Sequence, residues 1–203
     1  MKLKSIFLPL LSVVMLAGLT GCARYRAKSL KSLTRSSHVK KNNISFSYQL
    51  FTVADCKKYF DRNVIRNGYQ PIQITFVNNT DRYFNISKNS LSFDCVSTKE
   101  VAKSVHTNTV GRAVGFSVAG LFLWPFIIPA IVDGIGSAKS NKQLDADFAQ
   151  KALSKTIITP HSKINGIVFV STDMQFDEEF TLTVSDLSGN QFVLSTENAE
   201  LAV

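Results

Sequence analysis

Residues 113–132 constrain the fold of this chain more than any other feature of its sequence, because they include no charged side chain. A straight α-helix of 20 residues spans about 30 Å, the thickness of a bilayer core. Pro125 and Pro129 nevertheless lie in the second half of this segment, and proline kinks or breaks a helix because it removes a backbone donor. The pieces on either side are too short to cross. A simple transmembrane helix is therefore not expected.

The sequence instead predicts a helical hairpin inserted at about residues 101–153. A first helix is expected at about 108–122, followed by a turn at 124–126 and a second helix from about Pro129. The later part of the second helix is amphipathic, and its apolar face is expected to pack on the rest of the domain. The residues of this face recur at spacings of four: Leu144, Phe148 and Ala152.

Small residues form a stripe along the first predicted helix, with Gly111, Gly115 and Ala119 four positions apart. Such a stripe lets two helices approach closely, above all in lipid. The stripe is similar to the glycine-zipper segments of bacterial envelope lipoproteins. This resemblance implies helix packing at these three positions.

The apolar tip of the hairpin needs a cover, since a large exposed apolar patch marks an interaction site. Three interpretations stay open: a core element covered by the fold, a segment that enters one membrane leaflet, and a docking surface for a partner or a second copy. The expected contact residues are Leu121, Phe122, Leu123, Trp124, Phe126, Ile127 and Ile128.

The sequence around the insertion is typical of antiparallel β-structure. Ile44, Phe46, Tyr48 and Leu50 alternate with polar residues, which is the pattern of a half-buried strand. Short runs of the same type predict about eight strands, which favours a mainly β sandwich. The further expected runs are 71–76, 82–86, 91–96, 155–159, 164–171, 180–184 and 192–194.

Two stretches resemble small secreted bacterial immunoglobulin-like domains. One begins with a strand at Pro71 and ends in the turn Asn78-Asn79-Thr80, and the other covers residues 158–170. The resemblance implies an immunoglobulin-like antiparallel β-sandwich over residues 44–203. It implies no activity, because sandwiches carry many unrelated functions.

The N-terminus has a basic start, an apolar run at 5–17 and then Leu19-Thr20-Gly21-Cys22. This arrangement resembles the signal of bacterial lipoproteins. The resemblance implies a signal peptide at residues 1–21, cleavage before Cys22 and acylation of that cysteine. Ala23, rather than aspartate, implies the periplasmic face of the outer membrane by the sorting rule of enteric-type bacteria. An ordinary secretory signal is the alternative.

After Cys22, seven basic residues precede the first acidic one, so residues 22–43 are expected to be a basic flexible tether, with a reach of roughly 25 Å. Residues 44–203 carry 14 basic and 15 acidic residues. Anionic lipid headgroups and anionic cell-wall polymer are both candidate partners of the tether, and a solvated linker is the third interpretation.

Cys56 and Cys95 remain once Cys22 is acylated. In an oxidising compartment such a pair is expected to form a disulfide, which would stabilise the fold by about 4 kcal/mol. The alternative is two free buried thiols.

Catalytic and metal-binding patterns are missing from the sequence. His38, His106 and His161 have no carboxylate or thiol at ligand or triad spacing, so no metal, cofactor, catalytic residue or small-molecule substrate is expected. A nucleic-acid partner is not expected for an exported protein. The sequence favours a lipid-anchored envelope protein with a binding or scaffolding role, through an envelope partner or self-association. A membrane-active or lipid-binding protein is the second hypothesis, and a hydrolase is a residual one.

Overall fold

The structure is a computed structural model that describes residues 25–31, 33, 37–41, 43–107, 127–174 and 180–195, with the backbone alone at 37–38, 40 and 127–137. The chain divides into two compact units. The smaller unit comprises Met1–Tyr25 and His106–Leu144, and the larger comprises Arg26–Val105 and Asp145–Val203. The strands belong to the larger unit.

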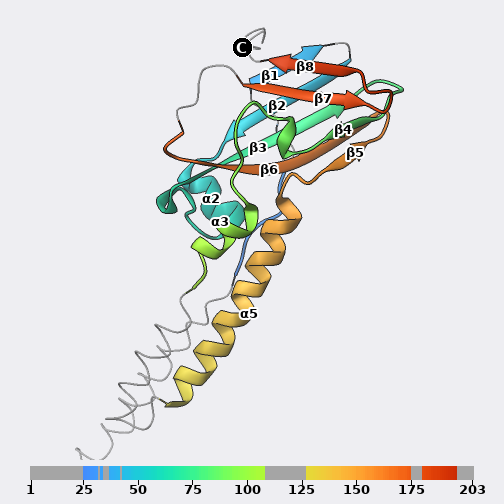
Figure 1. The fold of residues 1–203 in the computed structure, drawn as a ribbon. Coiled ribbons are helices and arrows are strands. Elements are labelled where there is room, and N and C mark those ends of the chain that lie inside the picture. Colours follow the sequence, from blue (N-terminus) through green and yellow to red (C-terminus); the bar gives the residue numbers. More distant parts are fainter. Residues whose placement is uncertain are drawn as a thin grey trace, which may run out of the picture. The chain divides into compact units, whose positions relative to one another are not determined.

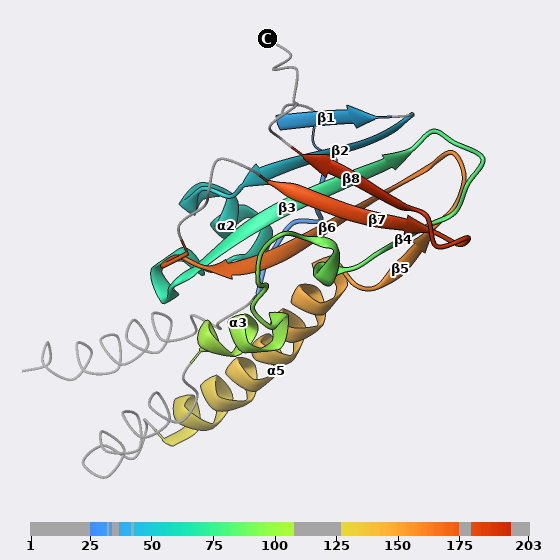
Figure 2. The ribbon, with the colours of Figure 1, turned by 45° about the horizontal axis from the view of Figure 1, so that its top comes forward.

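The described residues form two four-stranded antiparallel sheets (Figures 1 and 2). The first sheet has the order β1 (Ser37–Lys41), β2 (Ile44–Leu50), β3 (Tyr69–Asn78) and β6 (Ser162–Ser171). The second has the order β5 (Thr156–Ile158), β4 (Phe84–Ile86), β7 (Thr181–Asp186) and β8 (Gln191–Ser195). The predicted mainly β class is confirmed, and the arrangement is consistent with a sandwich.

A continuous apolar core joins the two sheets, because alternate residues of each strand point to one face. Phe76 of β3 meets Phe84 of β4 edge-on at 6.0 Å between ring centroids. Phe180, just before β7, stacks on Tyr48 and Phe46 of β2 at 4.3 and 5.4 Å. These aromatic contacts hold the sheets face to face.

The outer face of the first sheet is covered by helices. These are α2 (Val53–Phe60), α3 (Thr98–Ser104) and the last turns of α5 (Ile127–Lys151), with the short 3₁₀ helices η1 (Ile65–Asn67) and η2 (Lys88–Ser90) in the loops. Figures 1 and 2 show α2 and α3 beside the end of α5. Residues 166–170 of β6 are therefore buried on both faces.

Helix α2 has clear start and stop signals. The Thr52 hydroxyl accepts a hydrogen bond from the Asp55 N–H, and Asp55 accepts one from the Thr52 N–H, so the pair forms a capping box. The helix ends at Asp61, which adopts a left-handed conformation with φ 52° and donates its N–H to the Lys57 carbonyl. Cys56, Tyr59 and Phe60 form its buried face.

Most predicted strands are confirmed, and one is wrong. Residues 91–96 are not a strand of either sheet. Leu91 bridges to Leu182 in the second sheet, whereas Val96 bridges to Phe169 in the first. The run therefore crosses from one sheet to the other.

The predicted second helix of the insertion is confirmed as α5, which begins at Ile127. Pro129 lies in its first turn, where a backbone N–H has no partner within the helix, so the proline is tolerated there. The predicted first helix at 108–122 and the turn at 124–126 lie outside the described residues.

Gly166 provides the space for the chain that follows α5. A Cβ atom at this position would lie 2.7 Å from Leu153 Cα and 2.9 Å from Leu153 Cβ. The contact is close because the Leu153 N–H donates to the Ile167 carbonyl at 2.8 Å, beside the bridge between Ala152 and Ile167.

Gly166→Ala is expected to lower the free energy of unfolding by about 1–3 kcal/mol, because the backbone beside Leu153 must move. Chemical denaturation measures the loss. Lys163→Ala, at an exposed position of the same strand, is the control. Equal stability of the Gly166→Ala variant and the parent chain would contradict the close packing.

Asp186 organises the turn between β7 and β8. Its Oδ1 accepts the backbone N–H groups of Ser188 and Asn190, both at 2.9 Å, and its Oδ2 accepts the Asn190 side-chain amide at 2.9 Å. The Asn190 side chain lowers the pKa of Asp186 most, and the two N–H groups and Arg82 add to this, while desolvation opposes it.

Asn190→Ala is expected to destabilise the protein near neutral pH and to have less effect at low pH. A lowered folded-state pKa contributes stability above the unfolded value of about 4, and this stability is lost as the pH falls through the folded value. Unfolding measured from pH 7 to pH 2 checks the trend. A difference between the variant and the parent that stays constant with pH would contradict it.

Candidate functional site

Many of the residues singled out in the sequence lie outside the described part of the chain. These are Cys22, the stripe of Gly111, Gly115 and Ala119, and the apolar residues Leu121, Phe122, Leu123, Trp124 and Phe126. Ile127 and Ile128 begin α5. The anchoring and contact roles of these residues therefore stay predictions.

The predicted disulfide is not present, because Cys56 and Cys95 are free thiols in the structure. Cys56 is buried on α2, whereas the Cys95 thiol lies 3.8 Å from the Lys88 carbonyl and 3.9 Å from that of Phe93, on a loop. Burial raises the pKa of each thiol to about 11. Both are protonated at neutral pH and are poor nucleophiles.

One segment of the larger unit, which we call the platform, comprises α2 and the following loop through η1, residues 53–67. The larger unit begins at Arg26, is interrupted after Val105 and resumes at Asp145. The chain therefore passes between the two units at three points, which we call the first, second and third connections. Near each connection, the larger unit contacts the platform.

The first connection reaches the platform through an ordered segment. The Arg26 N–H donates to Asp61 Oδ2 at 3.1 Å, and the Lys28 N–H donates to the Lys58 carbonyl at 2.9 Å. The Lys31 carbonyl then accepts from Gln73 Nε2 at 2.7 Å.

The N-terminal region therefore departs from the flexible tether predicted for residues 22–43. Residues 26–31 bond to the folded unit, and Ser37–Lys41 form the edge strand β1. The reason is that these backbone groups find partners on α2, β3 and β2, which the basic composition does not reveal.

The second connection follows α3. Asn67 Nδ2, at the end of the platform, donates to the Ser104 carbonyl at 2.6 Å. The Tyr69 hydroxyl donates to Glu100 Oε1 at 3.1 Å. These bonds fix the C-terminal turn of α3, from which the chain leaves the larger unit at Val105.

The third connection is the end of α5. The ring of Phe148 lies 4.5 Å from that of Phe60 on α2 and 5.8 Å from that of Phe169 on β6. Lys151 is 6% exposed, and its Nζ donates to the Tyr59 carbonyl and to Asp147 Oδ2, both at 2.5 Å. The predicted packing of Phe148 on the sheet is confirmed.

Lys151→Ala is expected to lower the free energy of unfolding by about 2–3 kcal/mol, because it leaves Asp147 and the Tyr59 carbonyl without their charged donor. Thermal or chemical unfolding measures the effect. Lys155→Ala removes an exposed lysine four residues away and is expected to change stability by less than about 0.5 kcal/mol. Similar losses in the two variants would contradict the anchoring role of Lys151.

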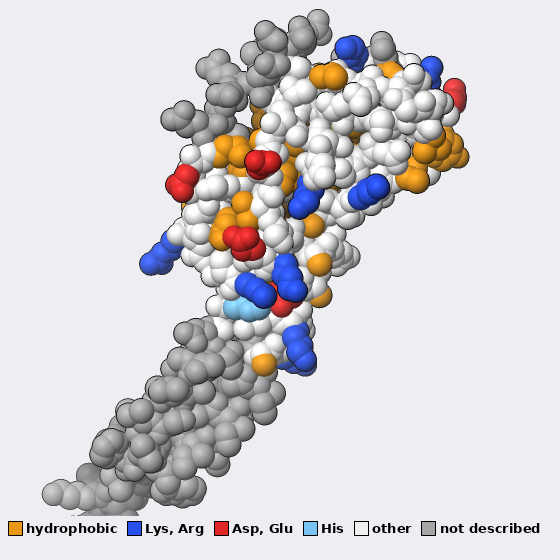
Figure 3. All heavy atoms as spheres, viewed as in Figure 1, with side chains coloured by type: hydrophobic (Ala, Val, Ile, Leu, Met, Phe, Trp, Pro, Cys, Tyr) orange, Lys and Arg blue, Asp and Glu red, His pale blue; other side chains and the backbone are white. Residues whose placement is uncertain are grey.

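Exposed basic side chains surround the first two connections. We call this group the basic rim; it consists of Arg26, Lys28, Lys57, Lys58, Arg66, Lys99 and Lys103. Figure 3 shows one face of the molecule, on which Lys and Arg side chains lie with a few Asp and Glu side chains between them. The rim combines three segments that lie far apart in the sequence.

The acidic side chains on the same segments bond within the fold. Asp55 belongs to the capping box of α2, Asp61 bonds to Arg62 and to the Arg26 N–H, and Glu100 accepts the Tyr69 hydroxyl. Among the described residues, no ion pair involves a cation of the rim. The carboxylates keep their charge in these bonds, but the seven cations outnumber them, so the rim carries a net positive charge.

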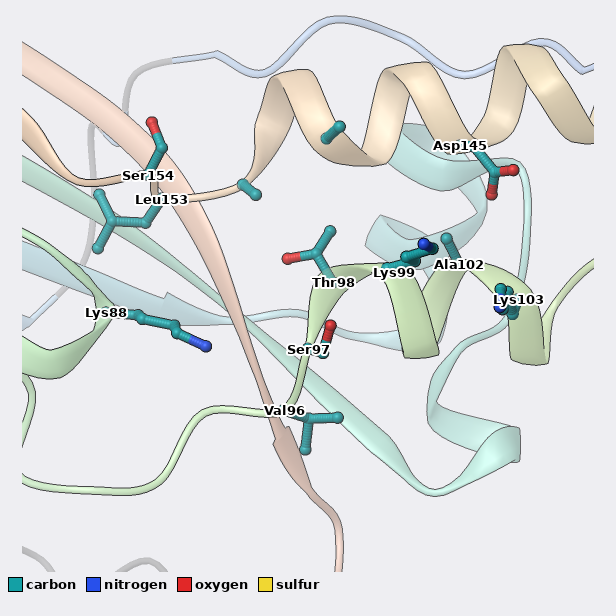
Figure 4. A pocket seen from close by; sticks show the side chains of 12 residues that line it. Lys88, Val96, Ser97, Thr98, Lys99, Ala102, Lys103, Asp145, Leu153 and Ser154 are labelled. Carbon is teal, nitrogen blue, oxygen red and sulfur yellow. The ribbon is translucent and has the colours of Figure 1, made fainter.

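A groove of about 560 Å³ lies between α3 and the end of α5 (Figure 4). Its apolar lining comes from Val96, Ala102, Ala149, Ala152 and Leu153. Lys99 and Lys103 project from α3 on one side, Lys88 lies farther along, and Asp145 lies near Ala102 on the other side. The twelve described residues of the lining include no histidine or cysteine, and the groove combines apolar contact surface with charged and hydroxyl side chains.

A reciprocal pair of hydrogen bonds lies within the smaller unit. Asn141 Oδ1 accepts the Thr107 N–H at 2.9 Å, and Asn141 Nδ2 donates to the Thr107 carbonyl at 3.1 Å. This reciprocal pair joins the segment after α3 to α5 across 34 positions of sequence.

The remaining candidates for chemistry are few. His161 Nε2 lies 3.0 Å from Asp81 Oδ1, but both side chains are exposed. In the part of the chain that the structure describes, no group of three or more His, Cys, Asp or Glu could hold a metal ion. Among the same residues, no helix is long and apolar enough to span a bilayer.

No family model matches the chain, and no curated protein or solved structure matches it either.

The platform and its contacts were not predicted from the sequence. A signal for α2 was present, however, because Thr52 and Asp55 have the spacing of a capping box and precede apolar residues at helical spacing.

Proposed function

We propose that this protein is a lipid-anchored component of the bacterial cell envelope with a non-enzymatic binding or scaffolding role. The anchor is Cys22, acylated after removal of residues 1–21, and the proposed location is the periplasmic face of the outer membrane. The supporting sequence feature is Leu19-Thr20-Gly21-Cys22. An accessory subunit of an outer-membrane assembly is the role that fits best.

The bonding of Arg26 to the platform carries this proposal. Four peptide units separate Cys22 from Arg26, so the two Cα atoms lie within about 15 Å of each other. The anchor therefore holds the larger unit against the bilayer surface rather than on a long flexible tether. A protein attached in this way presents its groove and sheets at a fixed place for a partner.

The finer fold assignments belong to the same proposal. The two-sheet body is an immunoglobulin-like sandwich, and the 101–153 insertion contains a helical hairpin. The bond between Thr107 and Asn141 supports the hairpin, because the chain between these residues must reverse its direction to bring them together.

A membrane-active or lipid-binding protein is the second candidate, and the uncharged segment favours it. If residues 113–132 fold back at 124–126, the uncharged arms are residues 113–123 and 127–132. As helices these arms measure about 16 Å and about 9 Å, roughly half the thickness of a bilayer core or less. The tip would then enter a single leaflet, with Trp124 among the contact residues.

Replacing residues 1–22 with a cleavable secretory signal that lacks Cys22 tests the anchor. If the lipid is the sole anchor, the secreted protein is expected to be soluble after an alkaline wash of the membranes. The parent chain, which keeps Cys22, is expected to stay in the membrane fraction. A parent chain that is found in the soluble fraction would overturn the lipid anchor.

If the hairpin enters a leaflet, the lipid-free protein is expected to stay in the washed membranes, and Trp124→Asp with Phe126→Asp is expected to release it. Carboxylates at the tip cost several kcal/mol in the hydrocarbon. Tyr83→Asp with Leu187→Asp, at two exposed positions outside the strands, is the control. Release by both pairs, or by neither, would contradict insertion through the tip.

A further inference from the structure

We propose that the basic rim is a docking surface for anionic lipid headgroups and fixes the orientation of the larger unit on the membrane. This inference rests on the proposed function, since the anchor brings the rim to the bilayer. It assigns a lipid-contacting role to seven side chains of the folded unit: Arg26, Lys28, Lys57, Lys58, Arg66, Lys99 and Lys103.

The placement of the rim beside the connections is the first argument. Lys28 bonds through its backbone to Lys58, and Arg26 bonds to the end of α2. At the second connection, Asn67 donates to the Ser104 carbonyl, and the rim residues Arg66 and Lys103 directly precede these two residues. Cys22 lies a few residues before Arg26, and the uncharged segment begins eight residues after Val105. Both proposed membrane elements therefore leave the larger unit next to rim cations.

The charge of the rim is the second argument. Its seven cations are exposed, and they outnumber the three acidic side chains on the same segments, Asp55, Asp61 and Glu100. Asp145 adds one more carboxylate beside Lys99 and Lys103. The rim therefore keeps a net positive charge, which attracts a partner with distributed negative charge. Each lysine or arginine close to an anionic membrane strengthens binding by about fivefold.

The side-chain types favour a lipid surface over a single specific ligand. Five of the seven cations are lysines, which act as flexible point charges and do not impose the two-pronged geometry of an arginine pair. They come from α2, α3 and two loops rather than from one enclosed cavity. A laterally mobile layer of headgroups can adjust to such a spread of charges.

Vesicle flotation of the complete mature chain, residues 22–203 with Cys22→Ser, tests the proposal. The vesicles contain phosphatidylcholine alone or with about one third phosphatidylglycerol, the anionic probe. Two variants change the rim: Lys57→Glu with Lys58→Glu, and Lys99→Glu with Lys103→Glu. Lys41→Glu with Lys163→Glu changes the net charge equally at exposed positions of β1 and β6 and is the matched control.

The parent chain is expected to bind anionic vesicles at least tenfold more tightly than neutral ones, with a preference that declines with added salt. Each rim variant is expected to lose at least tenfold in affinity for anionic vesicles and to keep its affinity for neutral ones. The control is expected to stay within about twofold of the parent. Thermal melts monitor folding, and Lys→Gln versions at the same positions replace any variant that unfolds.

Three results would overturn the proposal. Equal binding of the parent to both kinds of vesicle, or to neither, would exclude a headgroup-binding rim. An equal loss in the control would show that net charge, and not this surface, decides binding. Retention on isolated cell-wall polymer without any preference for anionic vesicles would assign the rim to the polymer instead. The fractionation experiment on Cys22 is independent of these results, so each proposal can fail without the other.

Discussion

The packing of α2 and the end of α5 on the outer face of the first sheet is the contact on which the rest of the structure depends. A sheet with two apolar faces must be covered twice, and the inner face is already occupied by the second sheet. Phe60, Phe148 and Phe169 meet within 4.5–5.8 Å on the outer face. The charge of Lys151 is satisfied beside them by Tyr59 and Asp147. Because α2 is part of this covering layer, the segments by which the chain enters and leaves the larger unit, at Arg26, Val105 and Asp145, lie near the same helix.

The same layer explains why the segment after the proposed anchor is ordered. Gln73 lies on the outer face of β3 and is buried, so its amide needs a partner. The Lys31 carbonyl supplies one, and the chain before it follows the surface to Lys58 and Asp61. A segment whose backbone satisfies buried groups of the domain is part of that domain. The short distance from Cys22 to the folded unit is a consequence of this bonding.

The sequence predicted those elements whose burial follows a simple period. The residues of β7 alternate between buried and half-buried positions, and this strand was predicted. The strand β2 was predicted from its alternating sequence, although Ser45 is also buried and Leu50 is exposed. Residues 91–96 have the composition of a strand, but they cross from one sheet to the other. Composition alone does not indicate such a crossing. Helix α2 was missed because it has eight residues and three buried positions, too few for a clear helical period. The pairing of Cys56 with Cys95 was inferred from their number and the expected oxidising compartment, and neither determines which elements hold the two residues.

The charge of the domain shows most clearly why the candidate site could not be read from the sequence. Residues 44–203 carry nearly equal numbers of basic and acidic residues, and this balance suggested that the basic character belonged to the N-terminal segment. The fold gathers an excess of cations on this surface, because Lys57, Lys58, Lys99 and Lys103 stay exposed and outnumber the carboxylates of Asp55, Asp61 and Glu100 beside them. Arg26 and Lys28 then join these lysines, since their backbone bonds to α2. A surface with an excess of positive charge thus arises from a nearly neutral domain, and only the contacts of the platform bring its parts together.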